Sequence, residues 1–98
     1  MSFSNTRARQ FLLEYGHVYT FRTHKHKLGK DWINDGRCRP KICDVEIQFV
    51  KEVTGTIGLV PYADKSGFSS AWEWTHEIFK LNPKLRKIKG YLYYVVKK

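Results

Sequence analysis

The segment 42–53 constrains the fold more than any other part of this 98-residue chain. From Asp44 to Phe49, polar and apolar residues alternate, which is the period of a half-buried β-strand. The alternation slips at Val50, and such a slip predicts a β-bulge. Near the C-terminus, the run Tyr91–Val96 is apolar at odd and even positions alike, which predicts a strand covered on both faces. These two strands require a sheet with a substantial core.

Two further elements are expected before residue 42. Ser4 or Asn5 can cap a helix that continues to Tyr15, because these side chains accept hydrogen bonds from the free N–H groups of a first turn. Gly16 supplies the left-handed residue that often ends a helix. The β-branched and aromatic run that follows predicts a strand with three residues on one face, namely Val18, Thr20 and Arg22.

Two elements are expected between residues 54 and 83. The run Thr56–Val60 predicts a short strand, because it is rich in β-branched residues. Ser70 and Glu73 have the spacing of a capping box and predict a helix that Asn82 and the following proline end. Its inward stripe is expected to consist of Trp74, Ile78 and Leu81.

The segment Thr23–Lys41 has no regular period and concentrates cations, two histidines and turn-forming residues. We interpret it as a long basic loop with room for one extra strand, and loops of this length in small domains are usually functional. The expected order is helix, strand, long loop, strand, strand, helix, strand. That order predicts a single α+β domain over residues 1–98, built as a small mixed or antiparallel β-barrel that two or three helices close.

The charge of the chain points to a polyanionic partner. Lysine and arginine outnumber acidic residues 18 to 9, which gives a formal charge of +9. Self-repulsion of this size lowers stability, and a polyanion explains it better than lysines selected for solubility, which usually accompany glutamate. The sequence has no apolar run near the ~20 residues of a membrane span and no recognisable signal peptide. We therefore expect a cytoplasmic monomer without a membrane partner.

The cysteines leave two interpretations open. Cys38 and Cys43 are the only cysteines, and without a secretory signal they are expected to be reduced and separate. Alternatively, they join His24 and His26 as four tetrahedral zinc ligands, although neither pair has the close spacing of most zinc sites. The first interpretation, with no metal and no cofactor, is preferred.

Several short motifs in order resemble the ASCH family, a branch of the PUA-like domains, and particularly its small archaeal-type single-domain members. These motifs are Gly16, Tyr19–Arg22, Asp44–Ile47, Ser66–Ser69 before a helix with Trp74, and Gly90–Tyr93. The resemblance implies a PUA-like β-barrel with a cleft beside the strand that carries the Thr-x-Arg motif. It also implies RNA or nucleotide-like ligands in that cleft.

Some proteins of this family are enzymes. One branch consists of amidohydrolases that act on acylated cytidines, and other members are described as ribonucleases. The threonine of the amidohydrolase strand matches Thr20, but the positions of its lysine and glutamate read His17 and Ser66. Two of the three catalytic groups are therefore replaced, which argues against amidohydrolase activity.

The charge, the aromatic residues and the resemblance together predict a nucleic-acid-binding module that prefers RNA to DNA. Cations neutralise phosphates, aromatic rings stack on bases and polar groups read base edges. The alternatives are a hydrolase that uses Thr20 and His17, and an architectural protein that binds duplex DNA without sequence preference. The predicted binding residues are Thr20, Arg22, Lys25, Lys27, Lys30, Trp32, Arg37, Arg39, Lys41, Ser66, Gly67 and Phe68.

Three of the large side chains need a structure to assign their place. Trp32 either stacks on an unpaired base or anchors its loop on the core. Trp72 is expected in the core together with Trp74; alternatively, it lines the cleft or covers the mouth of the barrel. Arg22 either contacts the ligand or pairs across the sheet with Asp44 or Glu46.

Overall fold

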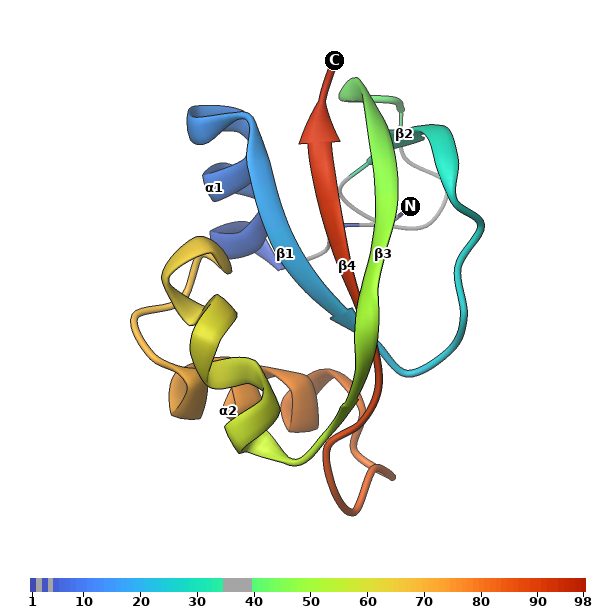
Figure 1. Cartoon of the computed structure of the whole chain (residues 1–98). Helices are drawn as coiled ribbons and strands as arrows, with labels where there is room; N and C mark the ends of the chain where they lie inside the picture. Colours follow the sequence, from blue (N-terminus) through green and yellow to red (C-terminus); the bar gives the residue numbers. More distant parts are fainter. Residues whose placement is uncertain (2, 4, 35–39) are drawn as a thin grey trace.

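The computed structural model describes residues 1, 3, 5–34 and 40–98 (Figure 1). Three helical segments and one four-stranded sheet make up the fold. The elements are α1 (Thr6–Tyr15), β1 (His17–Arg22), β2 (Gly29–Ile33), β3 (Cys43–Thr54), the 3₁₀ helix η1 (Thr56–Lys65), α2 (Ala71–Leu81) and β4 (Lys89–Lys97).

All neighbouring strands of the sheet are antiparallel, in the order β1-β4-β3-β2. The last strand of the chain, β4, therefore lies between β1 and β3. α1 contacts β1 and β4, η1 contacts β1 and β3, and α2 packs on η1. Figure 1 shows α2 toward the end of the sheet at which β1 finishes, with the C-terminus at the opposite end. The expected α+β architecture is confirmed.

The two faces of the sheet follow from the register, because directly paired residues share a face and successive residues alternate. Thr20 pairs with Tyr93, which pairs with Phe49, so these three side chains lie on one face, called here the Thr20 face. His17 and Leu92 lie on the other face, the His17 face. Tyr93 and Leu92 are both buried, so β4 is covered on both faces as predicted.

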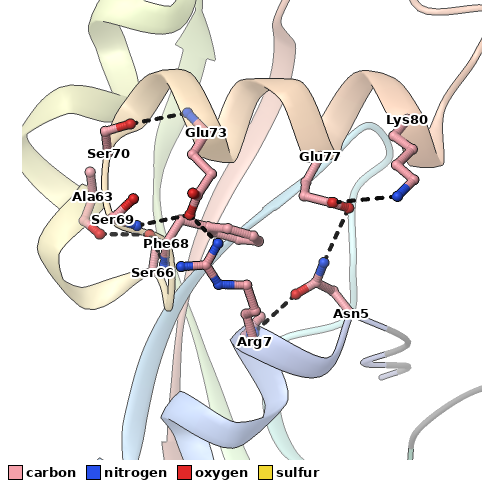
Figure 2. Close-up of polar contacts among 11 residues, drawn as sticks. Asn5, Arg7, Ala63, Ser66, Phe68, Ser69, Ser70, Glu73, Glu77 and Lys80 are labelled. Atoms are coloured by element: carbon pink, nitrogen blue, oxygen red, sulfur yellow. Dashed lines mark hydrogen bonds and ion pairs between the residues drawn. The ribbon is translucent and has the colours of Figure 1, made fainter.

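The predicted ends of both α-helices are confirmed. The side chain of Asn5 accepts a hydrogen bond from the Ala8 N–H (3.1 Å), and Gly16 ends α1 with a φ of 82°. The Ser70 hydroxyl accepts a hydrogen bond from the Glu73 N–H (3.1 Å) at the start of α2 (Figure 2). The predicted bulge in β3 is confirmed by a register shift between Phe49 and Lys51.

The strand predicted at Thr56–Val60 is wrong, because these residues begin η1. The chain turns sharply after β3: a Cβ at Gly58 would lie 2.9 Å from Cγ1 of Val53. Pro61, inside η1, has no N–H for a strand ladder. The end of β3 before this run already pairs with β4 along one edge, up to Thr54. Tertiary packing therefore overrides the strand propensity of this run.

The basic segment 23–41 contains β2, which pairs with the start of β3 and is the extra strand for which the sequence left room. Two expectations about α2 need correction. Leu81 is 55% exposed and does not belong to the inward stripe of α2, unlike the buried Trp74 and Ile78. Trp72 is 69% exposed and lies outside the core.

The sheet of the described residues is open rather than closed, because β1 and β2 each have one hydrogen-bonded neighbour. The expected barrel is therefore not confirmed. None of the helices in the described ranges is long and apolar enough to cross a membrane.

The cap of α2 gives a test of the fold. We expect Ser70→Ala to lower the free energy of unfolding by about 1 kcal/mol, because the Glu73 N–H loses its acceptor. Ser70→Asn is the control, since asparagine caps equally well, and urea denaturation measures both variants. Equal destabilisation by the two substitutions would contradict a capping role.

Candidate functional site

A cleft of about 440 Å³ lies between the start of α1, the end of β1 and α2. The residues that line it on the strand side include Thr20, Arg22, His24 and Lys25. Its volume falls within the range of roughly 300–1,000 Å³ that is typical of small-molecule sites. It is larger than a second hollow of about 260 Å³ described below, and we take it as the main candidate site.

Arg22 supplies a half-buried positive charge at this cleft. Its Nε is shielded from solvent, and its guanidinium lies over the ring of Phe3, 5.1 Å from the ring centroid. Burial lowers the pKa of Arg22 to about 10, so the side chain still carries its charge at neutral pH. A charge that is partly withdrawn from water attracts an anion more strongly than one in bulk water. Arg22 is therefore suited to bind a phosphate or carboxylate that enters the cleft.

The pairing of Arg22 with acidic residues of β3, one of the two possibilities from the sequence, does not occur. Asp44 and Glu46 lie on the His17 face, whereas Arg22 lies on the Thr20 face, and β4 separates the two strands. The two carboxylates instead form ion pairs with Lys41 and Lys98.

The predicted opposite wall of the cleft is present in part. Ser66 and Phe68 both line the cleft. The Ser66 hydroxyl donates a hydrogen bond to the Ala63 carbonyl (2.6 Å) and accepts one from the Phe68 N–H (3.1 Å), so it shapes the loop (Figure 2). Phe68 stacks on Trp74 with an angle of 15° between the rings. These two residues thus hold the wall in place rather than presenting reactive groups.

Gly67 does not line the cleft, but it allows the wall to approach α1. Its φ is 91°, and a Cβ at this position would lie 2.7 Å from the backbone oxygen of Arg7. Only glycine tolerates both the left-handed conformation and this contact. Gly67 is therefore a packing residue of the site and not a ligand contact.

Polar contacts between α1 and α2 set the width of the cleft (Figure 2). Arg7 forms an ion pair with Glu73, whose carboxylate also accepts a hydrogen bond from the Ser69 N–H (3.1 Å). One turn further along α2, the side-chain amide of Asn5 donates to Glu77 (3.3 Å). Both contacts join the first turn of α1 to α2, so the two walls are held at a fixed separation.

Several predicted binding residues do not lie at the cleft. Lys27, Lys30, Trp32 and Lys41 are not among its lining residues. Lys30 and Trp32 pair with Glu46 and Asp44, which places them on the His17 face of β2, at the opposite edge of the sheet from β1. Trp32 is 44% exposed, so it does not anchor a loop in the core. Arg37 and Arg39 lie outside the described residues.

The predicted hydrolase pair is not brought together. His17 and Thr20 are three residues apart on β1, so their side chains lie on opposite faces of the sheet. The ring of His17 packs between Phe11 and Tyr94, with ring centroids 6.0 and 5.8 Å away. The cleft instead contains His24 and His26 beside Thr20.

The structure adds a second basic segment that was not included among the predicted site residues. Asn82 lines the cleft, and Gly90 packs so closely on the Arg22 carbonyl that a Cβ would lie 2.4 Å from its oxygen. The chain between them, residues 83–89, therefore begins and ends beside the cleft, although none of these residues lines it. Within the described ranges, no ion pair involves its four exposed cations, which are Lys84, Arg86, Lys87 and Lys89. The basic composition of the last nineteen residues was the sequence signal for this segment.

The structure gives no support to a metal site. Of the four proposed ligands, Cys38 lies outside the described residues. In the part of the chain that is described, there is no group of three or more histidine, cysteine or acidic side chains that could hold a metal ion.

Comparisons of this chain with protein-family models, with curated proteins and with solved structures gave no match.

Gly67 and Gly29 provide a matched pair of substitutions. Both have a φ near 92°, but a Cβ at Gly29 would meet no atom within 4 Å. We expect Gly67→Ala to lower the free energy of unfolding by roughly 1–3 kcal/mol more than Gly29→Ala, because only Gly67→Ala adds a steric clash to the backbone strain. Urea denaturation measures the difference. Equal losses would show that α1 and the loop do not pack this closely.

The Arg7–Glu73 contact predicts a pH dependence of stability. Hydrogen bonding to the Ser69 N–H, together with the charge of Arg7, lowers the pKa of Glu73 below its ordinary value. The contribution of the carboxylate is therefore complete above pH 4.5 and is lost as the pH falls through the lowered pKa. We expect Glu73→Gln to destabilise the protein at pH 7 and to converge with the wild type once the pH falls below the lowered pKa of Glu73. A difference that is independent of pH would contradict the ion pair.

Proposed function

We propose that this chain is an RNA-binding module of the ASCH type that holds an unpaired nucleotide in the cleft beside Thr20 and Arg22. The observation that carries the proposal is the half-buried guanidinium of Arg22 in a cleft whose adjoining segment, 83–89, carries four exposed cations without ion pairs in the described ranges. Both the Arg22 guanidinium and these cations can bind phosphate, and a nucleic acid presents a phosphate at every nucleotide. The proposal includes the PUA-like barrel, with the four described strands as part of its wall.

The size of the cleft favours an unpaired strand. A volume of about 440 Å³ accommodates a ligand of the size of one nucleotide but not the width of a duplex. Sequence-specific proteins recognise RNA mainly through unpaired bases, which leave the stack and enter such pockets. The cleft therefore supports the RNA module over the alternative of an architectural protein that binds duplex DNA.

Polar side chains in the cleft support RNA over DNA. The hydroxyl of Thr20 and the rings of His24 and His26 provide donors and acceptors beside Arg22. The 2′-hydroxyl is the group by which a protein distinguishes RNA from DNA, and it both donates and accepts hydrogen bonds. The same histidines can act as an acid and a base, so the integrity of the RNA must be followed in any binding experiment.

The central test is the salt dependence of binding. Labelled single-stranded RNA, duplex RNA and duplex DNA are titrated by fluorescence anisotropy at several salt concentrations. We expect the double variant Lys84→Gln/Lys87→Gln to reduce the slope of log K against log salt by about 1.4 for single-stranded RNA, because each phosphate contact contributes about 0.7. The matched control is Lys41→Gln/Lys98→Gln, which removes two cations at the opposite end of the sheet and should leave the slope nearly unchanged.

Other outcomes of the titration discriminate the alternatives. Equal binding of all three nucleic acids would favour the architectural protein. Shortened RNA on a denaturing gel, lost in a His24→Ala variant, would favour a ribonuclease. Absence of binding at ~50 mM salt would refute the proposal, since electrostatic binding is strong under these conditions.

A further inference from the structure

A second hollow of about 260 Å³ lies on the other side of the segment that carries Lys25 and His26. These two residues line both the cleft and this hollow, so only their short segment separates the two. We call the second hollow the Phe49 groove, after the exposed ring at its side. Its other lining residues include Leu28, Glu52, Tyr91 and Tyr93.

The bulge in β3 creates this groove. Phe49 and Glu52 are three residues apart, so in a regular strand they would lie on opposite faces of the sheet. Because the register shifts between Phe49 and Lys51, Phe49 pairs with Tyr93 and Glu52 pairs with Tyr91. Tyr91 and Tyr93 share a face, so the bulge brings an aromatic ring and a carboxylate to the same side.

The aromatic residues form a firm surface at the groove. Tyr93 is buried, and its hydroxyl accepts a hydrogen bond from the His26 N–H (2.6 Å), which fixes the segment above it. The rings of Phe49 and Tyr93 pack at 65° with centroids 5.9 Å apart. Phe49 remains 47% exposed and Leu28 remains 51% exposed. A flat apolar ligand can therefore stack on Phe49 without displacing other side chains.

The groove has one cationic and one anionic side chain, Lys25 and Glu52. Lys25 Nζ lies over the ring of Tyr91, 5.9 Å from its centroid, on the side shared with the cleft. Glu52 is exposed, and no ion pair or hydrogen bond of its carboxylate is found within the described ranges. The Glu52 carboxylate lies on the same side of the sheet as the ring of Phe49 and forms no ion pair in the described ranges. It is therefore available to accept hydrogen bonds from a ligand.

We propose that the Phe49 groove binds an unpaired guanine base of the RNA whose neighbouring nucleotide occupies the cleft. Phe49 stacks on the base, and the two oxygens of Glu52 accept hydrogen bonds from its N1–H and 2-amino groups. Guanine is the one common RNA base with two adjacent donors on its Watson–Crick edge, which match a carboxylate. Lys25 contacts the phosphate between the two nucleotides. This assignment rests on the proposed RNA-binding function and names the base that the module prefers.

The test uses labelled six-nucleotide RNAs of uridine in which the third position is guanosine, inosine, adenosine or uridine. Anisotropy titrations of the full chain should show that guanosine binds on the order of tenfold more tightly than adenosine or uridine, since hydrogen bonds to a charged group are the stronger kind. Inosine, which lacks the 2-amino group, should fall in between.

Two variants with matched controls locate the effect. Glu52→Gln should reduce the guanosine preference to less than twofold, whereas Glu14→Gln, which removes a carboxylate on the exposed side of α1, should retain it. Phe49→Ala should weaken the binding of all four RNAs by roughly tenfold, because the base loses its stacking partner. Trp72→Ala, which removes another exposed ring, should leave the binding of all four unchanged.

The outcomes separate this inference from the function on which it rests. Salt-dependent RNA binding with equal affinity for the four oligonucleotides, or a guanosine preference that survives Glu52→Gln, would overturn the guanine site and leave the RNA module intact. Absence of binding to every RNA would overturn both. Circular dichroism of the four variants ensures that a loss of binding is not a loss of fold.

Discussion

The position of β4 at the centre of the sheet is the constraint on which the rest of the structure depends. Residues 17–22 and 45–54 are far apart in the sequence, and both pair with this last strand. β4 also shapes the candidate sites: Tyr91 and Tyr93 line the Phe49 groove, and Gly90 packs on the carbonyl of Arg22, a residue of the cleft. The sheet, its core and the candidate sites therefore require the end of the chain to be in place.

Two local departures from regular structure shape the functional surface. The positive φ of Gly67 lets the loop before α2 approach the backbone of α1, which builds one wall of the cleft. The bulge after Phe49 moves Glu52 to the Thr20 face and builds the neighbouring groove. The left-handed backbone at Gly67 and the bulge in β3 both depart from regular secondary structure. Each of them lies beside a hollow that can hold a ligand.

The charge of the protein is compensated unevenly. At the end of the sheet near the C-terminus, Lys41 and Lys98 pair with carboxylates of β3. Next to the cleft, the segment 83–89 contains no acidic residue, and Arg22 lines the cleft as a half-buried cation, although the carboxylate of Glu77 also lines it. A polyanionic strand bound there would relieve part of the repulsion that an excess of nine positive charges creates.

The sequence by itself determined the elements whose causes are local: the caps at Asn5 and Ser70, the end of α1 at Gly16, the bulge in β3 and the doubly covered β4. Four of the residues that it assigned to a binding site, Thr20, Arg22, Ser66 and Phe68, line the same cleft. Only the tertiary structure decided that 56–60 is helical, that Trp32 lies on the other face, and that Glu52 joins Phe49. Capping and periodicity act between residues a few positions apart, whereas these outcomes depend on which strands pair and in which register.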